Sequence, residues 1–254
     1  MSIVISVVSH KHFKIIKDLQ SLEHLAPYFD VYLIDNVKEA GLKEWCQKHN
    51  INYLANEIKC GFGENNNKVF DAAFKNGIGE DDWFLVLNPD VVIEKERIFE
   101  LVEKMRHDRV RLATVNLYKD INFKTYDNAV RHFPTLTDFF KSYLTGANPT
   151  IIDKSKITEP AKVDWASGSF LMFDAELYQQ IGGFDKSYFM YCEDIDICLR
   201  SMALQKEKVT FYPTVKALHF AAHSNRKLLS KSFFWHLRSM VRYLWVKKTM
   251  PHSL

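Results

Sequence analysis

The sequence predicts an α/β fold in which helices flank a mostly parallel β-sheet. Short apolar runs, rich in branched and aromatic residues, alternate four times with helix-like segments between residues 3 and 106. Continuous apolar runs of this length are typical of parallel strands that are covered on both faces. The regular alternation indicates a doubly wound sheet, which binds its ligands at the carboxyl ends of the strands.

The first half of the chain supplies these elements in order. Residues 3–8 predict the first strand. Residues 14–25 predict one helix, because Ile15, Leu19 and Leu22 recur at helical spacing. The further strands of this half are expected at residues 31–34, 51–54 and 83–87, and the further helices at residues 42–49, 65–76 and 96–106.

After residue 110 the alternation weakens. Residues 120–162 mix aromatic and polar side chains without a clear period, which predicts a long excursion over the site. Whether this excursion is a lid, an acceptor platform or an interface stays open. Strands are expected at residues 112–118, 170–173 and 209–212, and helices at residues 175–181 and from residue 193 to about residue 203.

The composition bounds the class of protein. The 254 residues carry 34 Lys and Arg against 31 Asp and Glu, and 47% are apolar, as in a folded, water-soluble protein. The four cysteines form no C-x-x-C pair, which argues against a zinc ribbon or a disulfide framework and for a reducing, cytoplasmic setting. The apolar N-terminus indicates a buried strand rather than a signal peptide, and no apolar run reaches the ~18 residues of a membrane span.

Charge is distributed unevenly along the chain. Residues 208–254 contain nine Lys and Arg and no acidic residue, whereas the rest of the chain has an excess of acids. An acidic body with a basic tail predicts that the tail meets an anionic partner. We therefore expect a main domain at residues 1–224 and a C-terminal helical tail at residues 225–254.

The tail predicts one basic amphipathic helix at residues 225–248. At ~100° per residue an apolar arc lies roughly opposite the basic side chains, which is typical of a helix on an anionic membrane. The alternative is a helix that packs this arc on the main domain or on a partner subunit. The apolar arc consists of Leu229, Phe233, Leu237, Met240 and Leu244. The residues expected at the membrane are Lys227, Lys231, Phe233, Phe234, Arg238, Arg242 and Trp245.

Polar residues follow three of the predicted strands. Ser9 ends the first strand, Asp35 and Asn36 end the second, and residues 88–90 (Asn-Pro-Asp) follow the fourth. These side chains therefore meet at one edge of the sheet. A carboxylate there can hold a divalent cation that neutralises a diphosphate. The alternative for residues 88–90 is an ordinary Asx-Pro turn.

Three carboxylates occur within residues 193–196 at the start of a predicted helix. The aromatic residues 188–191 would surround them with poorly hydrated surface, which raises the pKa of a carboxylate toward the range of a general base. The alternative is structural, because the helix dipole favours acids there and Asp196 can pair with Arg200.

Two further segments carry candidate binding residues. His219 and His223 are spaced for one face of a helix, but the H-E-x-x-H arrangement of zinc proteases is absent. A single metal or diphosphate contact stays open for His219, beside the alternative of an ordinary half-buried histidine. Residues 61–67 match neither a dinucleotide nor a P-loop pattern. They indicate a polar helix N-terminus that binds a nucleotide or sugar, or a loop capped by Asn.

In their order, these segments resemble the inverting family 2 glycosyltransferases with a GT-A, Rossmann-like fold. Within that family the chain looks like the bacterial rhamnosyltransferases that build O-antigen and related cell-envelope polysaccharides. The resemblance covers nearly all of residues 3–245. It rests on I-x-V-V-S-H at residues 5–10, D-N at 35–36, G-F-G-x-N-N-N at 61–67, L-N-P-D-V at 87–91, W-A-S-G-S-F at 165–170, G-G-F-D at 182–185, Y-F-M-Y-C-E-D-I-D-I-C-L-R at 188–200 and H-F-A-A-H-S-N-R at 219–226.

The resemblance implies a role for each matching residue. Asp194 is implied as the catalytic base, and Asp90 and His219 as ligands of a divalent metal, Mg²⁺ or Mn²⁺. Asn88 stands where many relatives have Asp, which is expected to weaken metal binding. The residues implied at the donor are Ser9, Asp35, Asn36, Gly61, Asn66, Asn88, Asp90 and Arg131. The residues implied on the acceptor side are Trp165, Gly168, Ser169 and Glu193.

The resemblance also implies the reaction. L-rhamnose passes from dTDP-β-L-rhamnose to a polyprenyl-diphosphate-linked sugar, expected to be GlcNAc, in a single displacement that inverts the anomeric centre. Such an acceptor would place the protein in the cytoplasm, peripherally on the inner face of the cytoplasmic membrane.

Other interpretations stay open at this point. The donor could instead be UDP-galactofuranose or a UDP-hexose, and the chain could be a non-catalytic sugar-nucleotide-binding subunit. A homo-oligomer also stays open. A nucleic-acid partner is not expected, because the body of the chain contains no recognisable nucleic-acid-binding module.

Overall fold

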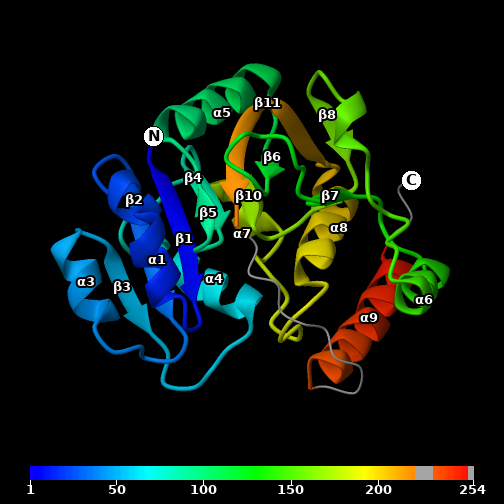
Figure 1. Ribbon diagram of the computed structural model, residues 1–254, viewed down its shortest axis with the longest axis horizontal. Helices are drawn as coiled ribbons and strands as arrows, with labels where there is room; N and C mark the ends of the chain where they lie inside the picture. The colour runs from blue at the N-terminus through cyan, green and yellow to red at the C-terminus, as the bar shows by residue number, and fades with distance from the viewer. Residues whose placement is uncertain (221–230, 251–254) are drawn as a thin grey trace.

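The protein is described by a computed structural model that covers residues 1–220 and 231–250. Strands alternate with helices along most of the chain (Figure 1). The strands are β1 (Ile3–Ser9), β2 (Asp30–Asp35), β3 (Asn52–Ala55), β4 (Trp83–Leu87), β5 (Val91–Val92), β6 (Leu112–Tyr118), β7 (Val130–Arg131), β8 (Ala161–Val163), β9 (Trp165–Ala166), β10 (Phe170–Asp174) and β11 (Val209–His219). The helices are α1 (Phe13–Leu19), α2 (Ser21–Leu25), α3 (Leu42–Lys48), α4 (Phe62–Lys75), α5 (Lys95–Asp108), α6 (Leu136–Thr145), α7 (Ala175–Gln180), α8 (Glu193–Gln205) and α9 (Lys231–Thr249), with a 3₁₀ turn at Lys154–Lys156.

One large sheet runs through the molecule in the order β3-β2-β1-β4-β10-β6-β11-β5, with β8 beside β11. The strands β1 to β4 pair in parallel, so that Ile5 lies between Val31 and Leu85. β10 is antiparallel to both β4 and β6, whereas β6 and β11 are parallel. The predicted α/β class is confirmed, while the reversed β10 was not predicted, because a strand buried on both faces looks alike in either direction.

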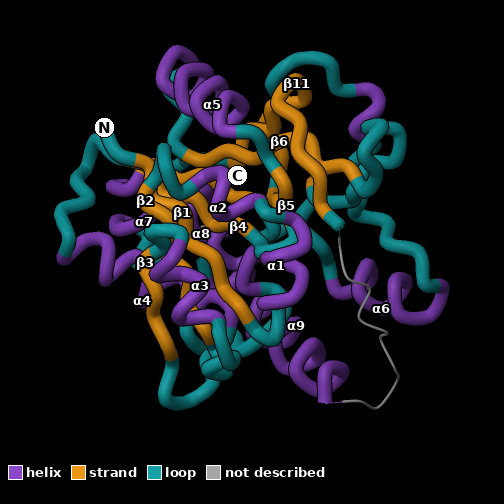
Figure 2. Tube along the Cα trace, turned by 60° about the vertical axis from the view of Figure 1, so that its left-hand side comes forward, coloured by secondary structure: helices purple, strands orange, loops and turns teal. Residues whose placement is uncertain are grey.

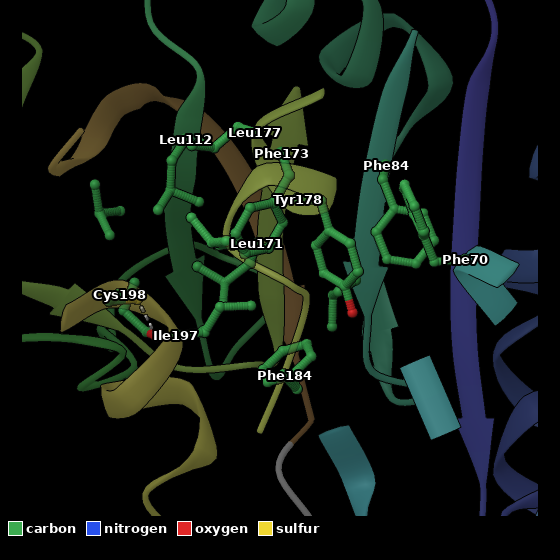
Figure 3. Packing of buried hydrophobic residues seen from close by; sticks show 14 of the residues in the cluster. Phe70, Phe84, Leu112, Leu171, Phe173, Leu177, Tyr178, Phe184, Ile197 and Cys198 are labelled. Carbon is green, nitrogen blue, oxygen red and sulfur yellow. Dashed lines mark hydrogen bonds between the residues drawn. The ribbon is translucent and has the colours of Figure 1, made fainter. Parts of the chain in front are cut away.

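Alternate residues of the central strands point to opposite faces and fill two cores. On one face Phe84 of β4 packs with Phe70 of α4 and Tyr178 of α7, their ring centroids 4.7 to 5.1 Å apart (Figure 3). On the other face Leu85 belongs to a core that also contains Leu101 of α5. Helices therefore lie on both sides of the strands (Figure 2), which explains the continuous apolar runs in the sequence.

Two predicted elements differ from the structure. The single helix expected at residues 14–25 is divided into α1 and α2, because Gln20 between them adopts a left-handed conformation (φ 54°). The strand expected at residues 209–212 continues to His219, since a register shift against β6 lets β11 pass Pro213. His219 therefore lies at the end of a strand, where it pairs with Val91 of β5.

The aperiodic segment of residues 120–162 contains β7, α6 and the start of β8. β7 pairs with β9, which ties this segment to residues just before β10. α6 begins at a capping box of Thr135 and Asp138, and its Phe139 packs against Tyr243 of α9 with ring centroids 6.2 Å apart. The segment thus connects the C-terminal helix to the region around β9, and α6 and α9 lie together at one end of the molecule (Figure 1).

The C-terminal helix packs on the main domain through a face that the sequence did not predict. Ser239, Tyr243 and Val246 are buried, and the last two join the core that contains Phe84. Of the predicted apolar arc, Leu237 is exposed, whereas Leu244 is partly buried and packs against this core. At ~100° per residue the centre of the buried face lies about a third of a turn from the centre of that arc.

Several parts of the tail prediction lie outside the described residues. These are the boundary between residues 224 and 225, Leu229 and Lys227, together with the side chains of Lys231 and Phe233. Among the residues that the structure does describe, no helix has both the length and the apolar character needed to cross a membrane.

Arg242, which was expected at a membrane surface, is used inside the protein. Its Nε lies 2.9 Å from Oδ2 of Asp185, and its guanidinium lies 5.5 Å from the ring centroid of Tyr188. This pairing gives Arg242 a structural role, and its contact with a membrane stays a prediction. The ion pair instead holds α9 on the loop that precedes α8.

Gly61 permits a close approach of two loops that are distant in the sequence. It precedes α4, and a Cβ atom at this position would lie 2.6 Å from the carbonyl oxygen of Phe189 and 2.8 Å from that of Tyr188. Both contacts are to backbone, which cannot rotate away.

We expect Gly61→Ala to destabilise the protein by roughly 1–3 kcal/mol, because the new methyl group overpacks this contact. Thermal unfolding measures the effect, at about 2–4 °C per kcal/mol for a chain of this size. The matched control is Gly79→Ala, whose new Cβ would meet only a side-chain oxygen of Asp82 at 3.7 Å. Equal melting temperatures for the two variants would contradict the close approach.

Candidate active site

The ends of β1 and β2 are joined by buried hydrogen bonds. The backbone N–H of Asn36 donates to the carbonyl of Ser9 at 2.9 Å. The Asn36 side chain donates to the Cys60 carbonyl at 2.9 Å and accepts from the Cys60 N–H at 2.9 Å. Asn36 therefore fixes the loop that leads through Gly61 into α4, at the edge where a donor was expected.

Asp35 is fully buried, and its carboxylate holds the following loop. Its oxygens accept from the backbone N–H groups of Val37 at 3.0 Å and Glu39 at 2.6 Å, and from the Tyr53 hydroxyl at 3.1 Å. These bonds give Asp35 a structural task. A contact of Asp35 with the nucleotide stays a prediction.

Asn66 is also fully buried, and its side chain joins α4 to the sheet. It accepts from the Ser6 hydroxyl at 2.7 Å and donates to the Phe62 carbonyl at 3.0 Å. The side chain has no exposed surface in this arrangement, so these bonds give Asn66 a structural role, and its contact with the donor stays a prediction. The polar run of residues 65–67 is explained by internal hydrogen bonding instead.

Asp90 and His219 come together from two distant parts of the chain. Nε2 of His219 lies 3.4 Å from Oδ1 of Asp90, and Nδ1 lies 3.1 Å from Oδ2 of Asp127. Burial disfavours the charged imidazole, but the two carboxylates outweigh burial and raise the pKa of His219 to about 9. The pairing of Asp90 with His219 agrees with their common predicted site.

Asp127 is a member of this cluster that the sequence reasoning missed. Burial acts to raise the pKa of Asp127, but the hydrogen bond and charge of His219 outweigh burial and lower it. Residue 127 lies in the aperiodic segment, where no motif or spacing marks it. Only the fold brings it behind the imidazole, where it fixes the orientation of the ring.

The described side chains allow a metal site of one kind, in which the protein supplies only part of the ligands. Within the described part of the chain, no cluster of three or more His, Cys, Asp and Glu side chains is arranged to hold a metal. Asp90 and His219 do offer an oxygen and a nitrogen to one position, and Asp127 supports the imidazole as carboxylates do behind metal-binding histidines. Cations bound with nucleotides often take one or two protein ligands and complete their shell with phosphate oxygens and water. The pair fits such a shared site and does not fit a site built from protein alone.

Asp194 lies in the first turn of α8, against the loop before β10. Its Oδ2 accepts from the Gly168 N–H at 3.3 Å, and its Oδ1 accepts from the Ile195 N–H at 2.9 Å. Burial raises the pKa of Asp194, while these two N–H donors and the charge of Arg131 partly offset that rise. A carboxylate with a raised pKa is a stronger base than a solvent-exposed one.

Gly168 is required where Asp194 meets the loop. A Cβ atom there would lie 2.8 Å from the Phe62 ring and 3.8 Å from the Cβ of Asp194. The Gly168 N–H is thus delivered to the carboxylate in a space that has no room for a side chain. This contact explains the glycine in the motif at residues 165–170, which was expected on the acceptor side.

The other two acids of residues 193–196 have different surroundings. Burial and the neighbouring Asp194 raise the pKa of Glu193 to about 8, and its Oε2 has no hydrogen-bond partner. Asp196 is fully buried and accepts from Nε of Arg200 at 2.7 Å and from the Tyr188 hydroxyl at 3.1 Å. The structural alternative is therefore confirmed for Asp196, whereas Glu193 and Asp194 remain available for chemistry.

A short hydrogen-bonded path joins the two halves of the site. The backbone N–H of Asn88 donates to the Ser169 carbonyl at 3.0 Å, one residue from the Gly168 N–H that contacts Asp194. The turn that carries Asp90 and the carboxylate of Asp194 are thus held by the same loop. This arrangement brings the turn of Asp90, where the sequence predicted a diphosphate, and the candidate base Asp194 to one place.

Arg131 and Trp165 border this loop. They lie opposite each other in the β7–β9 pair, and the Arg131 guanidinium lies 5.2 Å from the centroid of the Trp165 ring. The indole N–H of Trp165 donates to the His132 carbonyl at 2.9 Å. Arg131 therefore supplies positive charge near Asp194, which is the side where the sequence expected an anionic group.

Known proteins that resemble this chain agree on its family. Residues 14–199 match the family model for glycosyl transferase family 2. Rhamnosyltransferase WbbL of Escherichia coli (strain K12) is 36% identical over 253 residues, which are 98% of this chain and 95% of that protein. The N-acetylglucosaminyl-diphospho-decaprenol L-rhamnosyltransferase of Mycobacterium tuberculosis is 32% identical over 151 residues, which are 57% of this chain and 48% of that protein.

Solved structures share the fold. The crystal structure of GalNAc-T7 with UDP, GalNAc and Mn²⁺ has a TM-score of 0.65 at 15% identity, over 97% of this chain and 48% of that chain. The structure of S. aureus TarS 1-349 in complex with UDP-GlcNAc also has a TM-score of 0.65, at 13% identity, over 99% of this chain and 68% of that chain. Since the family model spans most of the chain and a relative above 30% identity spans almost all of it, the protein belongs to glycosyltransferase family 2 and is a glycosyltransferase with the GT-A fold.

Proposed function

We propose that the protein transfers L-rhamnose from dTDP-β-L-rhamnose to a sugar on a polyprenyl diphosphate, expected to be GlcNAc, at the inner face of the cytoplasmic membrane. The E. coli relative, which matches almost the whole chain, is named a rhamnosyltransferase. The M. tuberculosis relative is named for an N-acetylglucosaminyl-diphospho-decaprenol acceptor. The product would serve the synthesis of O-antigen or a related cell-envelope polysaccharide.

The observation that carries this proposal is the path from Asn88 through Ser169 and Gly168 to Asp194. It places a basic carboxylate beside the turn of Asp90, where a leaving diphosphate would be bound. Asp194 takes the proton of the acceptor hydroxyl while that oxygen attacks the anomeric carbon. The bond to the diphosphate breaks on the opposite face, so that the β-linked donor gives an α-linked product without a covalent enzyme intermediate.

The side chains around Asp194 and Asp90 support these two proposed roles. Burial and the charge of Asp194 raise the pKa of Glu193 to about 8, which favours Asp194 as the base of the pair. Arg131 offers positive charge to the diphosphate or to the acceptor phosphate. A divalent cation, when bound by Asp90 and His219 together with the donor, would neutralise negative charge on the diphosphate.

Replacement of the base tests the mechanism. We expect Asp194→Asn to lower turnover at least 10²-fold, because general-base catalysis contributes 10²–10⁴-fold, while donor binding is retained. Rhamnosyl transfer is measured with a lipid-linked GlcNAc acceptor, and donor binding by thermal shift with dTDP. Glu193→Gln is the matched control, since it exchanges a neutral acid for a neutral amide and should cost far less. If Asp194→Asn stayed active while Glu193→Gln did not, the base would be Glu193.

The pH profile supplies an independent test. The carboxyl of Asp194 accepts a proton only when ionised, so kcat/KM should fall as the pH decreases through its raised pKa. Arg131 lowers this pKa, and Arg131→Met should therefore move the acidic limb to higher pH. Arg131→Lys keeps the charge and should leave the limb near its original position. If the acidic limb of the kcat/KM profile were unchanged in Arg131→Met, Asp194 would not be the group whose ionisation determines that limb.

A thermal-shift screen with dTDP, dTDP-rhamnose, UDP and GDP, with and without Mg²⁺ or Mn²⁺, tests the donor. A ligand at 100 times its Kd stabilises the native state by about 2.7 kcal/mol, so we expect a clear rise in Tm with dTDP compounds. Asp90→Asn and His219→Gln should remove the metal-dependent part of this rise. A preference for UDP would favour UDP-galactofuranose or a UDP-hexose as donor, and the absence of any shift would contradict sugar-nucleotide binding.

A further inference from the structure

The side of α9 that faces away from the protein carries a stripe of large apolar residues. Phe234, Leu237, Val241 and Trp245 recur every three or four residues, and each is 41% to 61% exposed. At ~100° per residue they share one side of the helix, opposite the buried Ser239, Tyr243 and Val246. We call these four residues the outer face of α9. A helix that only covered the domain would be expected to turn polar side chains outward.

The charge around this stripe is of one sign. α9 contains no acidic residue, and the exposed Arg238 and Lys248 fall within the same arc as the outer face. An apolar stripe flanked by cations is complementary to the surface of an anionic bilayer, where the stripe enters the acyl boundary and the cations meet headgroups. Trp245 suits this position, because indole rings favour the membrane–water interface.

The inner side of the same helix holds the loop that leads to the base. The Ser239 hydroxyl donates to the Met190 carbonyl at 2.9 Å, and the rings of Trp235 and Phe189 lie 4.8 Å apart. The ion pair of Arg242 with Asp185 adds a third contact to this loop. Glu193 follows directly after the loop, so α9 joins its outer face to the acceptor side of the site.

We propose that the outer face of α9 binds the anionic surface of a phospholipid bilayer and so keeps the acceptor side of the site at the membrane. This proposal rests on the proposed function for its reason, because a polyprenyl-linked acceptor stays in the bilayer while its diphosphate and sugar emerge. The membrane side differs from the one expected from sequence. It adds Val241 and leaves out Arg242, whereas Leu237, Phe234 and Trp245 agree with the expectation.

Flotation of the full chain with vesicles tests the surface without any substrate. We expect binding to vesicles of phosphatidylcholine with 30% phosphatidylglycerol and much weaker binding to phosphatidylcholine alone. Exchange of Leu237 and Trp245 together for Ser should reduce the partition coefficient at least tenfold, with little change in Tm, because both side chains are exposed. The matched control exchanges Ile58 and Ile121 for Ser, two exposed apolar residues elsewhere, and should float like the original protein.

Removal of positive charge from α9 tests the electrostatic contribution to membrane binding. Replacing Arg238 and Lys248 by Gln should reduce binding to the anionic vesicles roughly tenfold or more, since each basic residue near such a surface contributes about 1 kcal/mol. Replacement of the exposed Lys43 and Lys48 of α3 by Gln is the matched control and should have little effect. Equal flotation of the outer-face variants and the original protein would overturn the proposal.

The outcomes also distinguish this proposal from the proposed function. A Leu237/Trp245 double variant that loses flotation but still uses a short-chain, water-soluble acceptor would support both. A protein that floats through α9 but transfers no rhamnose would keep the membrane surface and reject the function. If the double variant instead converts a dimer to a monomer in sedimentation, while the original protein ignores vesicles, the outer face binds a second copy and the membrane proposal is wrong.

Discussion

The antiparallel pairing of β10 with β4 is the contact on which the site depends. Phe170 lies opposite Leu87 in this pair, so the residues just before β10 meet the residues just after β4. That register sets the hydrogen bond between Asn88 and Ser169 and brings Gly168 to Asp194. A one-residue slip would turn every side chain of β10 to the opposite core, and because both cores are tightly filled, the register is strongly specified.

Their surroundings give the three carboxylates of residues 193–196 different proton affinities. Asp196 forms an ion pair with Arg200, accepts a hydrogen bond from the Tyr188 hydroxyl and serves the structure. Burial raises the pKa of both Glu193 and Asp194, but only Asp194 has two N–H donors, so the two neighbours are driven apart in proton affinity. Two adjacent acids with unlike surroundings differ in proton affinity, which would suit the single base of the proposed transfer.

Around Asp90 and His219, where the diphosphate is expected, an imidazole lies between two carboxylates. Asp127 holds one ring nitrogen of His219, and Asp90 faces the other. This cluster and the pair of Glu193 and Asp194 share the loop at residues 167–169 as a common support. α9 also supports the site, because its inner side fixes the loop before Glu193. Its outer side stays exposed.

The sequence alone determined the α/β class and most element boundaries of the first half, because continuous apolar runs and their alternation with helical segments report burial directly. It also carried the family, through motifs whose order is more informative than any one of them. The tertiary structure decided what those motifs do. Local spacing cannot show that the Asn66 side chain is buried between α4 and the sheet, that Asp127 lies behind His219, or that β11 passes Pro213 to reach the site, since each depends on contacts between distant residues. Which side of α9 is covered could not be read from the sequence for the same reason, because apolar residues lie on both sides of that helix and only packing against the domain decides it.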